Sequence, residues 1–439
     1  MLTIDRDILR LAVPALGALV AEPLFLLTDT ALVGHLGEVP LAGLGVASAV
    51  LQTVVGLTIF LAYATTPAVA RRLGAGDRPG AVKAGIDGMW LALGVGVVLA
   101  LAGWPLARPV VDLFGSTPAV GDAAVTYLTV SLLGIPGMLV VIAATGLLRG
   151  LQDTRTPLVV AVAGFAANAG LNALLIYGLG WGIAGSAAGT VLAQWAMATV
   201  YVVIAVRAAR RDRVALRPGR DGVGGAALSG GWLLLRTASL RVAILAAVTV
   251  AAGLGVTELA AFQIAMTIFT TLAFILDALA IAGQALIGHG LGAAEVDRVH
   301  LVTRRLVRWG VLTGVGLGAL TAALAPFAGP VFSPLPEVHS AVTAALLTMA
   351  VGIPLAGFVF VLDGVLIGAG DARYLAWTGL VNLAVFAPMV AALVVVHPEG
   401  TAGLVWLWLA FGLGYIGARA VTLGLRARGS RWIVTGAPA

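Results

Sequence analysis

Residues 8–34 read ILRLAVPALGALVAEPLFLLTDTALVG, an apolar run longer than the ~20 residues that a helix needs to cross a bilayer. Two acids, Glu22 and Asp29, lie inside this run. Ionisable groups are costly in lipid and usually serve a function there, so the run predicts a membrane-spanning helix with a functional carboxylate. It is too long and too polar for a cleavable signal peptide and has no clean small-residue cleavage site.

The rest of the chain has the same apolar character. Hydrophobic residues make up 60% and charged residues 10% of the 439 residues, against about 25% charged in a soluble domain. The mean hydropathy is +1.05. These figures exclude a soluble globular protein and a disordered chain. The apolar runs are continuous and do not alternate, which excludes a transmembrane β-barrel. Because there is no Cys, disulfides and thiolate metal sites are excluded as well.

Twelve apolar segments follow one another between polar breaks, so we expect an all-α integral membrane protein with twelve transmembrane helices. They are 8–34, 42–70, 84–106, 122–147, 157–178, 183–206, 230–252, 258–288, 305–328, 339–366, 373–396 and 402–423.

The basic residues define the expected orientation. In this arrangement 23 of the 26 lie on the side of the N-terminus, including the C-terminal region from Arg419 onward. Arg108 lies on the opposite side, and Arg236 and Arg241 lie inside the seventh segment. The positive-inside rule therefore predicts two cytoplasmic termini and a multi-pass protein of the inner (plasma) membrane. The net charge of +6 follows from this distribution of basic residues across the membrane, and it does not indicate a nucleic-acid partner.

The two halves of the chain match each other at a constant offset of 218 residues. Leu36-Gly37 matches Leu254-Gly255, Leu73-Gly74-Ala75 matches Leu291-Gly292-Ala293, Gly134-Ile135-Pro136 matches Gly352-Ile353-Pro354, and Gly150, Asp153 and Arg155 match Gly368, Asp371 and Arg373. Each half holds an even number of segments, so both enter the membrane from the same side. We expect two six-helix lobes, 1–206 and 226–439, related by a parallel internal repeat and joined by a cytoplasmic linker, 207–225.

Several polar residues of the N-terminal lobe fall at one depth. At ~1.5 Å per residue, Asp29, Tyr127, Asn172 and Thr190 each lie about 8–10 Å from the outer end of their segments, and Asn168 lies one turn deeper than Asn172. A desolvated carboxylate among them suits a group that takes up and releases a proton. The alternative is that each polar group only forms a hydrogen bond with a neighbouring helix.

The other intramembrane residues give further expectations. Asp277 and Asp363 either form an ion pair with Arg236 or Arg241 or take part in substrate binding. Pro14 and Pro23 give the first helix two candidate bend points, because proline removes an internal hydrogen bond. The residues that we assign to a substrate cavity, with ordinary packing as the alternative for the methionines, are Gln52, Thr145, Gln194, Met197, Met266, Asp277 and Asp363.

The chain resembles the multidrug and toxic compound extrusion family, and within it the DNA-damage-inducible F-like branch. The likeness covers nearly the whole chain. It is carried by Leu11-Ala12-Val13-Pro14, Thr28-Asp29-Thr30, Gly34-His35-Leu36-Gly37, Arg72-Leu73-Gly74-Ala75-Gly76-Asp77, Gly150-Leu151-Gln152-Asp153-Thr154, Gly182-Ile183-Ala184-Gly185-Ser186-Ala187-Ala188-Gly189-Thr190, Leu276-Asp277-Ala278 and Leu362-Asp363-Gly364-Val365-Leu366-Ile367-Gly368-Ala369.

The resemblance implies a secondary antiporter that works by alternating access and exports organic, often cationic, compounds in exchange for inward H⁺ or Na⁺. It also implies a coupling cluster, which falls here on Asp29, Tyr127, Thr145, Asn168, Asn172 and Thr190. Many relatives have a second acid in the fifth membrane segment, where this chain has Asn172. The site then holds one formal charge, which favours H⁺ over Na⁺ as the coupling ion. No cofactor or bound metal is expected, and the partners are small organic substrates and the lipid bilayer, with the chain a monomer.

Other functions remain as alternatives. A carrier of lipid-linked or organic-acid substrates on the same fold is suggested by Arg236 and Arg241. The match of Arg71–Asp77 to the loop motif of major facilitators is loose. An enzyme is not expected, because the five His lie in or beside loops and there is no HExxH, GxSxG or Walker motif. A structural scaffold is not expected either, because it gains nothing from acids at bilayer depth.

Overall fold

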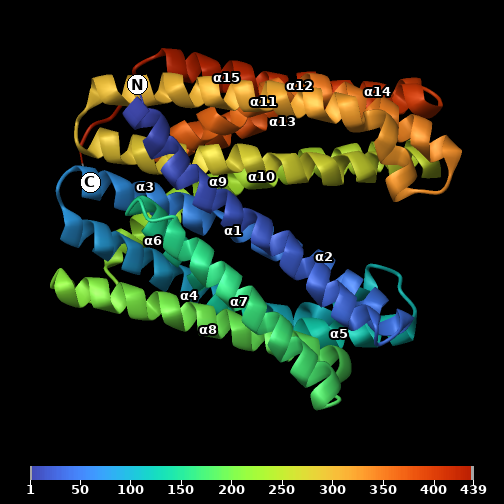
Figure 1. Cartoon of the computed structure of the whole chain (residues 1–439), viewed down its shortest axis with the longest axis horizontal. Coiled ribbons are helices and arrows are strands. Elements are labelled where there is room, and N and C mark those ends of the chain that lie inside the picture. Colours follow the sequence, from blue (N-terminus) through green and yellow to red (C-terminus); the bar gives the residue numbers. More distant parts are fainter. Residues whose placement is uncertain (1, 437–439) are drawn as a thin grey trace. The chain divides into compact units, whose positions relative to one another are not determined.

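A computed structural model describes residues 2–436, and these form helices joined by short loops without any β-strand. The helices are α1 (Leu2–Gly34), α2 (Glu38–Thr58), α3 (Phe60–Gly74), α4 (Arg78–Asp112), α5 (Pro118–Leu132), α6 (Ile135–Gly150), α7 (Arg155–Ala173), η1 (Leu174–Gly178), α8 (Gly182–Arg211), α9 (Arg220–Leu254), α10 (Val256–Gly292), α11 (Val296–Phe332), α12 (Pro336–Gly368), α13 (Ala372–Val396), α14 (Gly400–Leu409), η2 (Ala410–Ile416) and α15 (Gly417–Arg428) (Figure 1).

Eleven of the described helical stretches are long and apolar enough to cross a membrane. A twelfth span arises if α5 and α6, which meet at a 53° bend, are taken as one. The all-helical membrane fold predicted from the sequence is therefore confirmed. The apolar segment expected at 42–70 is interrupted at Ile59, between α2 and α3, and α7 continues into the short π-helix η1.

The described chain divides into two compact units. The unit that we call N-terminal is Val13–Gly230, with Gly436, and the C-terminal unit is Gly231–Thr435 together with the first residues up to Ala12. The lobe bounds expected from the sequence, with their linker at 207–225, stay a prediction.

The internal repeat is visible in the backbone. Residues with positive φ recur 218 positions apart as Gly37 and Gly255, Gly76 and Ala294, Gln152 and Gly370, and Gly182 and Gly400. Each of these residues lies at a break between helices, where the chain must turn sharply. The four pairs carry the register of the repeat from the start of α2 to the start of α8, and from the start of α10 to the start of α14.

Within each unit, small residues let helices approach closely, as is usual where lipid offers no hydrophobic driving force. In the C-terminal unit α12 packs against α10 and α11. A Cβ atom on Gly310 of α11 would overlap the carbonyl oxygen of Gly357 of α12. In the N-terminal unit α6 packs against α3 and α4, α2 against α5, and α7 against α8.

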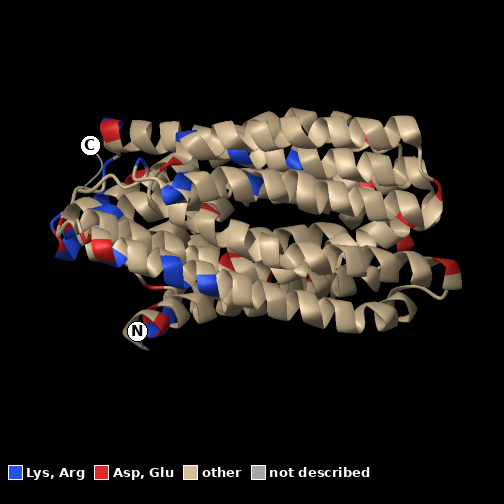
Figure 2. Cartoon of the chain, turned by 90° about the horizontal axis from the view of Figure 1, so that it is seen from above, with Lys and Arg blue, Asp and Glu red and all other residues tan. Residues whose placement is uncertain are grey.

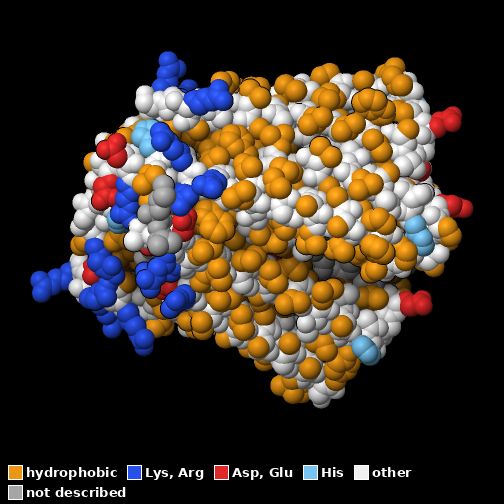
Figure 3. All heavy atoms as spheres, turned by 45° about the horizontal axis from the view of Figure 1, so that its top comes forward, with side chains coloured by type: hydrophobic (Ala, Val, Ile, Leu, Met, Phe, Trp, Pro, Cys, Tyr) orange, Lys and Arg blue, Asp and Glu red, His pale blue; other side chains and the backbone are white. Residues whose placement is uncertain are grey.

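The distribution of charged and hydrophobic side chains on the surface is that expected of a membrane-spanning chain. Figure 2 shows Lys and Arg gathered at one end of the helices, apart from a few inside them. The face in Figure 3 is covered with hydrophobic side chains between this basic end and an end that carries acids and His. Such a band is what helices exposed to lipid require. The chain is therefore a multi-pass membrane protein.

Candidate functional site

The Asp29 carboxylate is the centre of a buried polar cluster in the N-terminal unit. Asp29 lies on α1 and is only 4% exposed. Its Oδ2 accepts a hydrogen bond from Tyr127 Oη of α5 at 3.1 Å. Its Oδ1 accepts hydrogen bonds from Asn172 Nδ2 of α7 at 2.8 Å and from Ser186 Oγ of α8 at 2.5 Å. Four helices therefore meet at one carboxylate.

A second layer of hydrogen bonds holds the donors in place. Asn172 Nδ2 also donates to Asn168 Oδ1 at 3.1 Å, and Asn168 Nδ2 donates to Thr190 Oγ1 at 3.0 Å. The pairs Asn168 with Asn172 and Ser186 with Thr190 are each four residues apart, which places both members on one face of their helix. The structure thus brings together five of the six residues predicted for the coupling cluster, whereas Thr145 forms its hydrogen bond with Tyr201. Their role in coupling stays a prediction.

Ser186 belongs to the cluster but was missed from the sequence. It is fully buried and forms the shortest of the three hydrogen bonds to Asp29. Its depth did not single it out, because it lies only three residues into the segment expected from Ile183. The spacing of four residues from Thr190 was the signal that could have found it, since both side chains then share one face of the helix.

The backbone around the cluster is tightly arranged. A Cβ atom on Gly189 would overlap Asn172 Oδ1, so glycine at this position lets α8 approach α7. Beyond Asn172 the chain forms η1, in which Tyr177 Oη donates to the carbonyl oxygen of Leu32 on α1 at 2.5 Å. A short π-helical stretch often marks a functional site.

Apolar side chains surround this polar cluster. Tyr127 is part of a buried hydrophobic cluster that includes Val33, Leu44, Ala107 and Ile176. Exclusion of water strengthens hydrogen bonds to the carboxylate. It also makes a buried polar group without a hydrogen-bond partner costly in free energy. Asn172 Oδ1 has no hydrogen-bond partner among the described residues. The cluster therefore contains one formal charge and one free acceptor atom.

The residues of the N-terminal unit that are assigned to a substrate cavity differ in exposure and in their contacts. Gln52 is exposed on α2, and Thr145 Oγ1 donates to Tyr201 Oη at 3.2 Å, apart from the Asp29 hydrogen bonds. Gln194 is half-buried on α8. Met197 is buried, and its Sδ packs against Gly164 of α7. Their role in substrate binding stays a prediction.

The candidate bend points lie in an unbroken helix. α1 runs from Leu2 to Gly34 and contains both Pro14 and Pro23. Bending of α1 during transport therefore also stays a prediction. Glu22, the other acid of this helix, is exposed rather than part of the Asp29 cluster.

The C-terminal unit contains a buried ion cluster centred on Asp363 of α12. Asp363 pairs with Arg236 of α9 and with Arg419 of α15, whose Nη2 lies 2.5 Å from Asp363 Oδ1. An ion pair with Arg236 was one of the two alternatives predicted for Asp363, and this ion pair is present. Arg241 is exposed, and Met266 and Asp277 are half-buried on α10.

The expected place of Arg419 was wrong. Arg419 was expected among the cytoplasmic C-terminal residues, but it is 5% exposed and belongs to the buried ion cluster. The physical reason is that α15 is part of the last candidate span, Gly400–Arg428, and Arg419 lies near its start, with Asp363 opposite to neutralise it.

Within residues 2–436, no three His, Cys, Asp or Glu side chains lie close enough to hold a metal ion together. The Asp29 cluster instead combines one carboxylate with hydroxyl and amide groups.

Comparison with known proteins gives the family. The MatE family matches residues 14–174 and 234–393, once in each repeat. Protein DETOXIFICATION 44, chloroplastic, of Arabidopsis thaliana is 32% identical over 422 residues, which cover 92% of this chain and 79% of the relative. DNA damage-inducible protein F of Escherichia coli is 26% identical over 383 residues, 84% of this chain and 81% of the relative.

The fold is also that of solved transporters. A transporter of the MOP superfamily from Pyrococcus furiosus superposes with a TM-score of 0.86 at 23% identity, over 97% of this chain and 95% of that one. This likeness shows the two-lobed fold, and the sequence matches show the family. The chain therefore belongs to the MatE family, which is a family of multidrug and toxic compound transporters and not of enzymes.

Proposed function

We propose that this chain is a secondary antiporter that exports organic, often cationic, compounds in exchange for inward H⁺, with Asp29 as the proton-carrying group. The observation that supports this most is the single buried carboxylate of Asp29, which three donors from three other helices hold in place. A group that changes charge at such a junction gives the two states of a transporter different free energies.

The hydrogen-bond pattern explains how a proton would act. All three neighbours donate to the carboxylate, an arrangement that fits its ionised form. A protonated Asp29 has an O–H that must itself find an acceptor. The hydroxyls of Tyr127 and Ser186 can turn to accept, and Asn172 Oδ1 is already without a donor. Proton binding therefore rearranges contacts between α1 and α5, α7 and α8.

The proposal includes a bend of α1. Neutralisation of Asp29 loosens its contacts with the neighbouring helices, and α1 then bends near Pro14 or Pro23, where an internal hydrogen bond is missing. This movement is the proposed link between proton binding and substrate release in an alternating-access cycle.

Na⁺ is the competing coupling ion. Na⁺ prefers several anionic or carbonyl oxygens, whereas Asp29 is the only acid in the hydrogen bonds of the cluster among the described residues and already accepts from three donors. Transport by the purified chain in proteoliposomes, with a pH gradient or a Na⁺ gradient imposed alone, distinguishes the two ions. Export driven by Na⁺ without a pH gradient would replace H⁺ in this proposal.

The central test is the Asp29→Asn variant in everted membrane vesicles. This side chain keeps its size but cannot change charge, so we expect proton-driven export of a fluorescent drug to fall to background. Asp112→Asn is the matched control, because Asp112 is an acid of the same unit with a side chain 64% exposed. Full export by Asp29→Asn would end the assignment, as would equal loss in both variants at equal protein level.

An exporter of organic acids or lipid-linked anions is a second candidate, and a specific observation favours it. The buried cluster in the C-terminal unit brings two guanidinium groups to one carboxylate. Buried positive charge attracts an anion and repels an organic cation. Competition between anionic and cationic compounds for the same transported dye in proteoliposomes separates this candidate from the first.

We further propose a monomer in the inner (plasma) membrane with both termini in the cytoplasm. The distribution of Arg and Lys supports this orientation. Two of the plant relatives are named as chloroplastic, so the compartment needs a direct test. Reporter fusions at either terminus that are active only in the cytoplasm are expected to be active at both, and an active periplasmic reporter at either end would contradict the orientation.

A further inference from the structure

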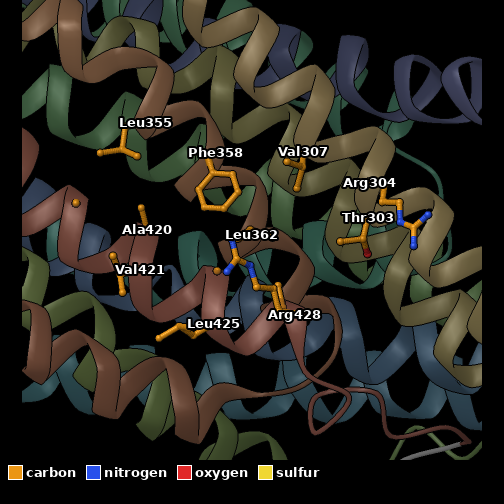
Figure 4. Close-up of a pocket in the computed structure, with 13 residues that line it drawn as sticks. Thr303, Arg304, Val307, Leu355, Phe358, Leu362, Ala420, Val421, Leu425 and Arg428 are labelled. Carbon is orange, nitrogen blue, oxygen red and sulfur yellow. The ribbon is translucent and has the colours of Figure 1, made fainter.

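The C-terminal unit has a lateral groove between α11, α12 and α15 (Figure 4). Its volume is about 650 Å³, within the range of sites that hold a small molecule. The larger apolar residues that line it are Val307, Leu355, Phe358, Leu362, Val421 and Leu425. Val421 and Leu425 are 60% and 63% exposed, so the groove opens on the outside of this unit.

The groove changes from apolar to basic along its length. On α15 its lining runs from Gly417 to Arg428, which at ~1.5 Å per residue is about 16 Å. This length is close to half of the ~30 Å hydrocarbon core, that is, to one leaflet. Arg304 lies near the start of α11 and Arg428 is the last residue of α15, whereas Gly417 is the first residue of α15 and Leu355 lies 13 residues before the end of α12.

The two arginines of the groove differ from their neighbours. Arg298, Arg305 and Arg426 at the same end form ion pairs with acids of the C-terminal unit. Arg304 and Arg428 are exposed and form no ion pair within the described residues, and none of the residues lining the groove is acidic. Guanidinium groups bind phosphate through paired hydrogen bonds.

We propose that this groove binds one anionic phospholipid of the leaflet on the arginine-rich side. Arg304 and Arg428 hold the phosphate group, and an acyl chain lies along Leu355, Phe358 and Leu425. A cation pair at headgroup level above an apolar groove one leaflet long matches a phospholipid in both charge and length. A soluble phosphate would leave the apolar part empty.

The repeat shows that the fold does not require this site. The position of Arg304 in the C-terminal repeat corresponds to Ile86 in the N-terminal repeat, and that of Leu425 corresponds to Arg207. Of the two groove arginines, only Arg428 has a basic counterpart, Arg210. The combination of two arginines with an apolar groove is therefore particular to the C-terminal unit, and Arg210 provides a matched control.

Native mass spectrometry of the purified full chain tests the proposal. With dioleoyl phosphatidylglycerol and dioleoyl phosphatidylcholine at equal concentration, we expect one phosphatidylglycerol to be retained preferentially. The variants Arg304→Gln and Arg428→Gln should each weaken retention about fivefold, the contribution of one basic residue to anionic-lipid binding. Arg210→Gln should leave retention unchanged.

A variant that keeps all the charges separates the groove from general surface electrostatics. Leu425→Trp places a large side chain in the apolar part, at an exposed position that tolerates it, and should abolish preferential retention. The proposal is overturned by equal retention of the two lipids, by an equal effect of Arg210→Gln, by full retention in Leu425→Trp, or by complete displacement of the lipid with inorganic phosphate.

Discussion

The two repeats place opposite chemistry at equivalent positions. The polar residues Asp29, Tyr127, Asn168, Ser186 and Thr190 of the N-terminal repeat correspond, 218 residues later, to Ala247, Ala345, Phe386, Leu404 and Trp408. All five counterparts are buried. Phe386 and Trp408 each contact Phe411, with ring centroids 6.1 Å apart, so aromatic packing fills the space that hydrogen bonds fill in the other unit.

At a second pair of positions, the C-terminal repeat has the more polar side chains. Thr145 and Tyr201 share a hydrogen bond in the N-terminal unit, and their counterparts Asp363 and Arg419 form the buried ion pair of the C-terminal unit. The counterpart of Arg236 is Ala18. The same backbone thus accepts a neutral or a charged contact, so neither cluster is demanded by the fold. Each is a property of the side chains placed on it.

The largest expected effect comes from breaking the ion cluster. Arg419→Ala leaves the Asp363 carboxylate with less compensation, and removal of one partner from a buried ion pair costs about 3–5 kcal/mol. The triple variant Arg236→Ala, Asp363→Thr, Arg419→Tyr copies the N-terminal repeat, and we expect it to recover most of that loss. Thermal unfolding of the purified variants in detergent measures both. A triple variant no more stable than Arg419→Ala would show that the two repeats are not interchangeable here.

A carboxylate placed at the apolar counterpart of Asp29 should also destabilise the chain, though less. Ala247→Asp puts a carboxyl group at a fully buried position, and the counterparts of Tyr127 and Ser186, which are Ala345 and Leu404, have no side-chain donor. An unsatisfied buried polar group costs roughly 1–3 kcal/mol. Thermal unfolding should show this loss for Ala247→Asp, with Ala247→Val as the control for size. An unchanged stability would mean that water or other donors reach the position.

The sequence allowed the depth of the polar residues to be predicted, but not their lateral contacts. Asp29, Tyr127 and Asn172 were expected at one level because each is a similar number of residues from a loop. Ser186 was missed because depth alone does not tell which face of a helix points inward. Arg419 was misplaced because a basic residue near the last polar stretch is normally cytoplasmic, and its partner Asp363 is 56 residues away. Contacts between distant helices depend on packing angles that the apolar pattern does not contain.

An intermediate effect is expected at Ser186. Ser186→Ala removes one of the three donors that favour the ionised form of Asp29, so protonation becomes easier and half-maximal export should move to higher pH. A hydrogen bond to a charged group is worth about 1.5–3 kcal/mol, which corresponds to a movement of about one pH unit or more. Export measured over a pH series checks this, and Ser131→Ala is the control, because Ser131 is buried in α5 without a hydrogen bond to Asp29. A shift to lower pH would mean that Ser186 accepts from a protonated Asp29 instead.

The smallest effect is expected at Tyr201, which occupies the neutral counterpart of Arg419. Tyr201→Phe removes the hydrogen bond with Thr145 but leaves no buried charge behind, so it should cost only about 0.5–1.5 kcal/mol and leave export near its normal level. Thermal unfolding and vesicle export, measured beside Arg419→Ala, give the contrast directly. A loss as large as that of Arg419→Ala would place Tyr201 in the transport machinery. The two repeats would then differ in the chemistry of this contact but not in how much each unit depends on it.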